Sequence, residues 1–271
     1  MPELPEVETI RRDLEPRLVG RRIEEVWTSG KALRLAKPLD VAALRTHCGH
    51  VVTGIRRRAK YLLIDTDDTA LLVHLGMSGH LRFVPGSAPK LPHTHVVWRL
   101  AGGDELRYTD ARRFGTVRAL VEGEAAPELT VLGDEPLSLT TQRLAELAAG
   151  TRRPIKLLLL DQRRIAGVGN IYASEALFEA RIRPSVPARR LGVQRIAALR
   201  DGIVRVLERG LANRGTTLRD YVDSSGTPGG NQHALRVYGR EGEPCVRKDG
   251  GIVRRTIDAA RSTFYCPRCQ R

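Results

Sequence analysis

The sequence predicts an α+β protein with a β-sandwich or barrel-like N-terminal domain, a helical domain and a finger-like β-hairpin at its end. Short β-rich runs fill residues 20–122, helix-period apolar residues follow a linker, and three of the four cysteines lie near the C-terminus. The 271 residues are 41% hydrophobic, which is enough for two packed cores.

The chain is expected to start with a helix over residues 5–18. Pro5 suits the first turn, and Glu6 and Glu8 suit the positive end of the helix dipole. One face of this helix is apolar and consists of Val7, Ile10, Leu14 and Leu18.

Strand-like runs follow, separated by turn signals such as Asp67-Asp68 and Gly102-Gly103-Asp104. These runs cover residues 21–27, 50–57, 60–65, 69–76, 94–100 and 105–110. Together with the first helix they predict a two-sheet or barrel-like domain over residues 1–125.

A linker rich in Glu, Pro and Gly spans residues 121–136, and the pattern then becomes helical. The helical segments contain Leu144 and Leu147, residues 155–162, residues 170–180 and an amphipathic stretch from Ile196 to Leu211. A Gly- and Ser-rich loop covers 215–235, and strand-like runs at 234–240 and 262–266 surround the cysteines. The predicted domains are 1–125, a linker 126–140, a helical domain with its loop 141–235, and a hairpin 236–271.

The charge predicts a polyanionic partner. Lys and Arg number 45 against 31 acidic residues, a formal net charge of +14. No apolar run approaches the roughly 20 residues of a spanning helix, and no signal segment opens the chain. These observations favour nucleic acid over an anionic membrane.

The cysteine distribution predicts a metal site rather than a disulfide framework, and therefore a reducing, cytoplasmic setting. Cys245, Cys266 and Cys269 lie close together in sequence, whereas Cys48 stands alone and is expected to be a small core residue.

The first residues offer a nucleophile. Removal of Met1 would expose the secondary amine of Pro2. An α-amino group is roughly 10–20% neutral at pH 7, so it can attack a sugar C1′ and form an iminium that favours elimination. Glu3 could then protonate a sugar oxygen. The alternative is a capped helix start with acids on its dipole.

Six motifs that occur in order along the chain favour the catalytic interpretation of the first residues. They are PELPEVETIRR, RRRAKYLL, HLGMSG, DARRFG, DQRRIAGVGNIYASEALF and STFYCPRCQ. The chain resembles the bacterial formamidopyrimidine-DNA glycosylases from Pro2 to Gln270. The related endonuclease VIII family typically begins PEG-P rather than PEL-P, so the purine-directed branch is favoured.

The resemblance implies catalytic roles for five residues. Pro2 matches the Schiff-base nucleophile, Glu3 the acid, and Glu6 a further active-site acid. Lys60 matches the lysine of β-elimination, although it also ends a basic run that begins at Arg56. Arg261 matches the finger arginine of δ-elimination, although it could equally be a generic phosphate contact.

The resemblance also implies a DNA-binding surface. Met77, Arg112 and Phe114 match the residues that fill the gap left by a flipped nucleotide; the alternative for Met77 and Phe114 is core packing. The segment from Asp161 to Phe178 resembles a helix–two-turn–helix with a phosphate at its second helix. The remaining DNA-binding candidates are His74, His93, Arg152, Lys156, Asn170 and Arg219, the last standing where relatives carry Lys.

The metal finger departs from the family pattern. Members usually carry C-x2-C, sixteen residues and C-x2-C, a tetrahedral zinc signature. Here Cys266 and Cys269 keep the second pair, but no cysteine follows Cys245 at that spacing. Asp249 lies where a one-residue insertion would put the missing ligand, because sixteen residues separate it from Cys266. The sequence predicts one structural zinc held by Cys245, Cys266, Cys269 and Asp249; the alternative is a zinc-finger-like hairpin that has lost its metal.

The resulting expectation is a base-excision repair enzyme, a bifunctional glycosylase and AP lyase. It would excise 8-oxoguanine and formamidopyrimidines from double-stranded DNA, act at abasic sites, work as a monomer and associate with the nucleoid through DNA binding. The alternatives are an oxidised-pyrimidine glycosylase and a DNA-binding relative that has lost catalysis.

Overall fold

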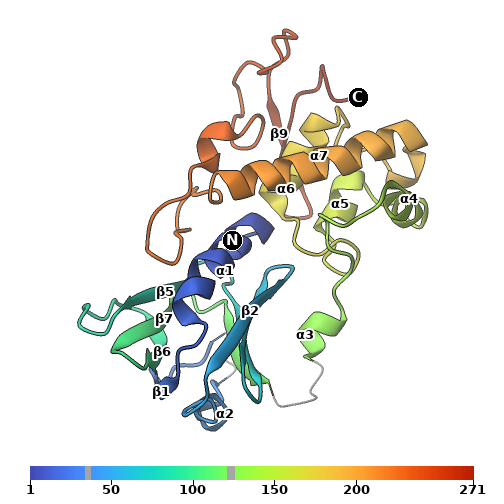
Figure 1. The fold of residues 1–271 in the computed structure, drawn as a ribbon. Helices are drawn as coiled ribbons and strands as arrows, with labels where there is room; N and C mark the ends of the chain where they lie inside the picture. Colours follow the sequence, from blue (N-terminus) through green and yellow to red (C-terminus); the bar gives the residue numbers. More distant parts are fainter. Residues whose placement is uncertain (34–37, 121–125) are drawn as a thin grey trace. The chain divides into compact units, whose positions relative to one another are not determined.

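The computed structural model describes residues 1–33, 38–120 and 126–271, so the start of the expected linker, 121–125, lies outside it. The described chain divides into two compact units (Figure 1). The N-terminal unit contains Met1–Thr130 and Asn213–Gly230, and the C-terminal unit contains Val131–Ala212 and Asn231–Arg271. Residues 213–230, which the sequence grouped with the helical domain, therefore pack within the N-terminal unit.

The N-terminal unit is built on two antiparallel four-stranded sheets. One sheet has the order β1 (Ile23–Thr28), β6 (Thr94–Leu100), β7 (Asp104–Asp110) and β5 (Gly79–Pro85). The other has the order β2 (Val52–Arg58), β3 (Tyr61–Thr66), β4 (Ala70–His74) and β8 (Thr116–Leu120). The helices of this unit are α1 (Leu4–Leu18), α2 (Val41–Arg45) and α3 (Pro127–Thr130).

One apolar core joins both sheets to α1. It contains Trp98 and Tyr108 from one sheet, Leu62 and Val73 from the other, and the predicted apolar face of α1. The α+β class and the N-terminal sandwich are thereby confirmed. Strands β5 and β8 were not expected: β5 starts at a glycine and ends at a proline, and β8, with the sequence TVRAL, contains only two β-branched residues and no aromatic one.

The C-terminal unit carries the expected helices α4 (Thr141–Ala149), α5 (Ile155–Leu160), α6 (Asn170–Glu179) and α7 (Val193–Ala212). It ends in a hairpin of β9 (Arg254–Asp258) and β10 (Arg261–Tyr265). A small core packs Phe178 of α6 against Val237, Cys245, Val253, Phe264 and Cys266. The finger is therefore attached to α6 through apolar contacts.

The strand expected at 234–240 is absent, and this prediction was wrong. The backbone N–H groups of Arg236, Val237 and Tyr238 all donate to the Glu175 carboxylate, at 2.9–3.1 Å. Because a side chain takes these donors, they cannot form a ladder. The partner of β10 is instead β9, whose exposed, arginine-rich sequence gave no alternating pattern.

Among the residues that the structure describes, no helix combines the length and the apolar character needed to cross a membrane.

Candidate active site and nucleic-acid interface

Pro2, Glu3 and Glu6 lie buried at the start of α1. The Glu6 carboxylate accepts a hydrogen bond from Glu3 N through Oε2 at 2.8 Å. Its other oxygen, Oε1, accepts one from Thr216 N at 2.7 Å. Glu6 therefore fixes both the entry of the chain into α1 and the beginning of the 213–230 loop.

The 213–230 loop is anchored to the N-terminal unit by ion pairs and by a buried ring. The Arg214 guanidinium lies 2.6 Å from both Asp13 of α1 and Asp223 of the loop. Tyr221 inserts into the apolar core and donates to Arg214 O at 3.2 Å. Burial opposes ionisation of Asp223, but Arg214 and the Ser225 and Thr227 donors hold its pKa below the usual range. Arg219, by contrast, is exposed on this loop.

Lys60 lies buried in the tight turn that joins β2 to β3. The residue before it, Ala59, has a φ of 53°, a left-handed conformation that turns the chain sharply. The lysine is thus placed by a turn inside the N-terminal unit, as a buried amine rather than as an ordinary surface member of the basic run.

Met77 and Phe114 are exposed rather than packed in the core, with 40% and 44% of their surface accessible. Their loops touch, since a Cβ on Gly76 would lie 2.5 Å from the Phe114 backbone. The Arg112 guanidinium stacks 4.6 Å from the centroid of the Phe114 ring. Two exposed apolar side chains and a planar cation therefore lie on touching loops, and neither Met77 nor Phe114 is packed in the core.

Asp110, which the sequence analysis missed, joins these two loops. Its buried carboxylate accepts from Ser78 Oγ at 2.7 Å, from Gly115 N at 2.8 Å and from Tyr108 OH at 3.0 Å. Ser78 Oγ in turn accepts from Arg112 N at 3.1 Å. The position of Asp110 at the end of β7, within the motif DARRFG, was the sequence signal that could have identified it.

Two expected DNA-binding residues are histidines of this unit. His74 accepts a hydrogen bond from Gly76 N at 3.2 Å, and His93 is exposed with a φ of 63°.

Lys156 and Asn170 lie at the base of the finger hairpin. Lys156 is fully buried and donates to Thr263 Oγ1 at 2.7 Å and Ser262 O at 3.0 Å. Asn170, the first residue of α6, donates to the same Ser262 carbonyl at 2.9 Å. Arg152 and Arg261 are exposed, and Arg261 borders a cavity of about 270 Å³ together with Arg153 and Gln162.

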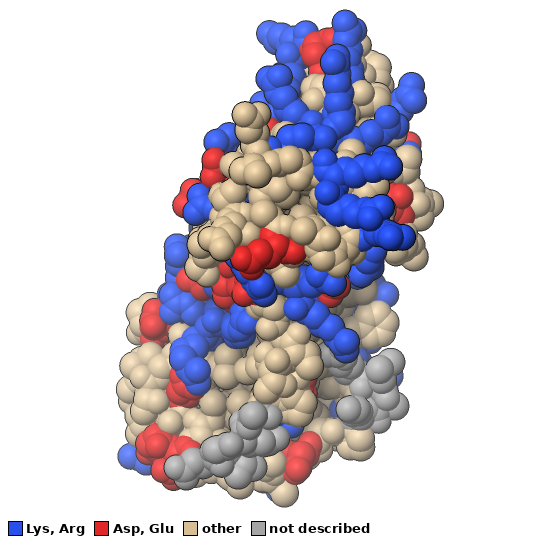
Figure 2. Space-filling model, turned by 90° about the vertical axis from the view of Figure 1, so that its right-hand side faces the viewer, with Lys and Arg blue, Asp and Glu red and all other residues tan. Residues whose placement is uncertain are grey.

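Basic side chains gather on the C-terminal unit. Figure 2 shows Lys and Arg crowding the upper part of the face it draws, which this unit forms. Its exposed arginines include Arg181, Arg183, Arg189, Arg190 and Arg268. Such a surface suits phosphate contacts.

Cys245, Asp249, Cys266 and Cys269 come together in the finger, with one possible ligand atom from each lying within 4.8 Å of all the others. The two Sγ atoms of Cys245 and Cys269 are 3.9 Å apart, and Cys266 Sγ is 3.7 Å from Asp249 Oδ2. Tetrahedral zinc with bonds of about 2.0–2.3 Å requires ligand separations of roughly 3.3–3.8 Å. The two printed separations lie close to that range, so the three thiols and the carboxylate could hold one zinc ion.

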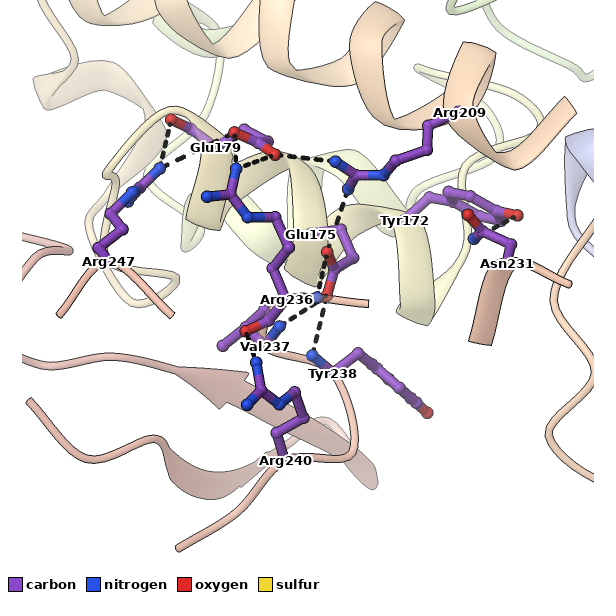
Figure 3. Close-up of polar contacts among 10 residues, drawn as sticks. All are labelled: Tyr172, Glu175, Glu179, Arg209, Asn231, Arg236, Val237, Tyr238, Arg240 and Arg247. Carbon is purple, nitrogen blue, oxygen red and sulfur yellow. Dashed lines mark hydrogen bonds and ion pairs between the residues drawn. The ribbon is translucent and has the colours of Figure 1, made fainter. Parts of the chain in front are cut away.

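Charged contacts surround the neighbouring end of α6 (Figure 3). Glu175 takes the three backbone N–H groups described above, and Arg209 of α7 lies 3.3 Å from it. Glu179 pairs with Arg209 at 3.1 Å and with Arg236 at 2.8 Å. Burial raises the pKa of Glu175 despite its donors, whereas the arginines hold the pKa of Glu179 below its usual range against the opposing effect of burial.

Two family descriptions match the chain. That of the formamidopyrimidine-DNA glycosylase N-terminal domain covers residues 1–117, and that of the formamidopyrimidine-DNA glycosylase H2TH domain covers residues 132–222. The formamidopyrimidine-DNA glycosylase of Moorella thermoacetica is 51% identical over 91% of this chain and 92% of its own length.

Solved structures resemble this chain over all or nearly all of its length. The Lactococcus lactis Fpg mutant G226P in complex with Fapy-dG-containing DNA is 34% identical, covers 100% of both chains and has a TM-score of 0.91. The MutM (Fpg) protein of Thermus thermophilus is 39% identical over 99% of this chain and 98% of its own, with a TM-score of 0.88.

Proposed function

The chain belongs to the formamidopyrimidine-DNA glycosylase family, and we propose that it excises oxidised purines from double-stranded DNA and then cleaves the strand. The substrates would be 8-oxoguanine and formamidopyrimidines. The observation that carries the proposal is the buried Pro2–Glu3 start of α1, held by Glu6. The Lactococcus lactis relative bound to Fapy-dG DNA supports the substrate class.

In the first step, the Pro2 nitrogen attacks C1′ of the damaged nucleotide once Met1 has been removed. The glycosidic C–N bond breaks, the base leaves with the proton that the Pro2 nitrogen gives up, and Glu3 protonates the sugar ring oxygen as the C1′–O4′ bond breaks and the ring opens. The product is an iminium between Pro2 and C1′. Because the hydrogen bond from Glu3 N to Glu6 fixes the backbone between these two groups, nucleophile and acid are oriented together.

Elimination follows from the iminium. Loss of a proton from C2′ breaks the C3′–O bond and releases the 3′ phosphate, and loss of a proton from C4′ then breaks the C5′–O bond. Lys60, as a buried amine, would assist the first elimination and would contact the phosphate next to the damaged nucleotide. Arg261, exposed at the start of β10, would steady the phosphate in the second.

Access to C1′ requires the nucleotide to leave the stack. Met77 and Phe114 would fill the gap as apolar wedges, and Arg112 would donate to the orphaned cytosine. Their exposure and the Asp110 contacts that hold both loops support this role. His74, His93, Arg152 and Arg219 would contribute to the DNA-facing surface, and Lys156 and Asn170 would support it from beneath the hairpin.

One zinc ion would be held by Cys245, Cys266, Cys269 and Asp249 and would fix the fold of the finger. Metal analysis of the purified protein should give one zinc per chain, and Asp249→Ala should lower that stoichiometry or speed zinc release. Protein purified without metal, which takes up none on addition of zinc, would show that packing alone holds the hairpin.

Borohydride trapping tests the chemistry. The mature protein should form a covalent adduct with a duplex carrying 8-oxoguanine opposite cytosine, and Pro2→Gly should abolish or strongly reduce it. Thymine glycol in the same sequence separates the purine branch from the pyrimidine branch. An active preparation whose N-terminal nitrogen is blocked, or still carries Met1, would refute the mechanism.

A further inference from the structure

Arg247 connects the finger cluster to α6. Its Nη1 lies 3.4 Å from Cys269 Sγ, and its Nη2 donates to Glu179 O at 3.1 Å. The guanidinium carbon is 4.2 Å from the centroid of the Phe178 ring, and the side chain is only 14% exposed. One planar cation thus contacts a thiol, a helix-terminal carbonyl and an aromatic face.

The helix end suits this cation. Glu179 is the last residue of α6, so its carbonyl belongs to the negative end of the helix dipole. The Glu179 carboxylate is 3.8 Å from Arg247 and is already paired with Arg209 and Arg236 (Figure 3). Arg247 is therefore held on the α6 side by the Glu179 carbonyl and lies near a carboxylate that two other arginines contact.

The proposed metal centre would also be stabilised by a nearby cation. Three thiolates and one carboxylate around a divalent ion carry a net charge of −2. An N–H donor directed at a thiolate sulfur orients the ligand and offsets part of this charge, and such supporting contacts typically change metal affinity about 10- to 100-fold. Arg247 supplies that donor to Cys269.

The extra residue between Cys245 and Asp249 explains how Asp249 and Arg247 both reach the cysteine cluster. Three residues separate Cys245 from Asp249, and Lys248 among them has a φ of 55°. Asp249 Oδ1 is fixed by Gly251 N at 2.8 Å, which leaves Oδ2 facing Cys266 Sγ. The longer segment thus brings a carboxylate to the ligand set and Arg247 to the sulfur and α6.

We infer that Arg247 is a positioning residue of the metal centre, which fixes the Cys269 thiolate and ties the centre to the end of α6. This inference rests on the proposed zinc site. Lysine is a poor substitute, because one ammonium cannot reach sulfur and carbonyl while lying flat on Phe178.

Cobalt provides a direct readout. The full-length protein is stripped of metal and loaded with Co²⁺, and wild type is compared with Arg247→Met, Arg247→Lys and the control Arg240→Met. Arg240 belongs to the same finger region, but its guanidinium contacts Glu243 and Arg236 O. Zinc dissociation constants are measured by competition with a chromophoric chelator.

In Arg247→Met, the thiolate-to-cobalt charge-transfer band should move to longer wavelength, because the sulfur loses a donor. Its zinc dissociation constant should rise about 10- to 100-fold. Arg247→Lys should recover part of the affinity, and Arg240→Met should match wild type in both measurements.

Two outcomes overturn the inference in distinguishable ways. If the wild-type protein binds neither Zn²⁺ nor Co²⁺, the proposed metal centre itself is refuted. Wild type that binds metal normally, together with an Arg247→Met spectrum and affinity identical to it, leaves the centre intact but removes the role of Arg247. Circular dichroism checks folding, and if Arg247→Met does not fold, an unchanged Arg247→Lys spectrum and affinity decide against the inference.

Discussion

Two buried glutamates hold irregular segments in the two units by the same device. Glu6 accepts one backbone N–H from the chain entry at Glu3 and one from the loop at Thr216. Glu175 accepts three consecutive backbone N–H groups, at residues 236–238, and faces Arg209. Each carboxylate replaces a missing ladder or helix partner for buried donors.

The difference lies in what each carboxylate holds. Glu6 positions the proposed nucleophile and acid, and the loop that follows α7. Glu175 positions the segment that leads into the finger, whose Arg261 is proposed to steady a phosphate in the second elimination and takes no part in excision of the base. We therefore expect changes near Glu6 to reduce excision more than stability, and changes at Glu175 to reduce stability first.

The largest effect should come from Glu3→Gln. Loss of a general acid typically costs about 10²- to 10⁴-fold in rate, and the substitution leaves the backbone donor to Glu6 in place. Single-turnover excision of 8-oxoguanine measures it, with Glu15→Gln, on the half-exposed side of α1, as the control. A wild-type rate in Glu3→Gln would assign the protonation to another group.

Glu175→Ala should destabilise the C-terminal unit by about 3–5 kcal/mol, because three donors and Arg209 lose a buried carboxylate. Urea unfolding measures the loss. Glu208→Ala, in the exposed face of α7, is the control. If Glu175→Ala is as stable as wild type but excises poorly, the distinction drawn between the two glutamates fails.

Glu6→Gln should be milder, with excision falling roughly 5- to 100-fold, equivalent to about 1–3 kcal/mol for a lost buried acceptor. The amide keeps one acceptor oxygen and presents a donor to the other N–H. The free energy of unfolding should change less than the activation free energy, and an equal change in both would place Glu6 in the same class as Glu175.

The smallest effect should be a response to acid in the 213–230 loop. Since the pKa of Asp223 is lowered in the folded state, its ionisation stabilises the loop above the unfolded value near 3.9. That contribution is lost as the pH falls through the lower, folded value. Hydrogen exchange, corrected for its intrinsic pH dependence, should show loop protection decreasing as the pH falls below the unfolded value near 3.9. Asp223→Asn should be less protected at pH 5 and should lose less protection than wild type as the pH falls, because only the contribution of Asp223 is removed while Glu6 and Asp13 still hold the loop.

The sequence was most informative where local pattern and burial agree. Apolar residues must be buried, and their spacing predicted the apolar face of α1, the buried runs of β3 and β4, and the helical period of α7. The motifs identified the family, and the sixteen-residue spacing identified Asp249 as the fourth member of the finger cluster. Each of these signals is carried by residues close together in sequence.

Only the tertiary structure decided which distant donors and acceptors meet. Glu175 removes residues 236–238 from any strand, Asp110 joins two loops, and Arg247 reaches both Cys269 and Glu179. It also decided that residues 213–230 pack with the N-terminal unit. The physical reason is that a buried polar group must find a partner wherever the fold offers one, and one side chain can replace a whole strand as that partner.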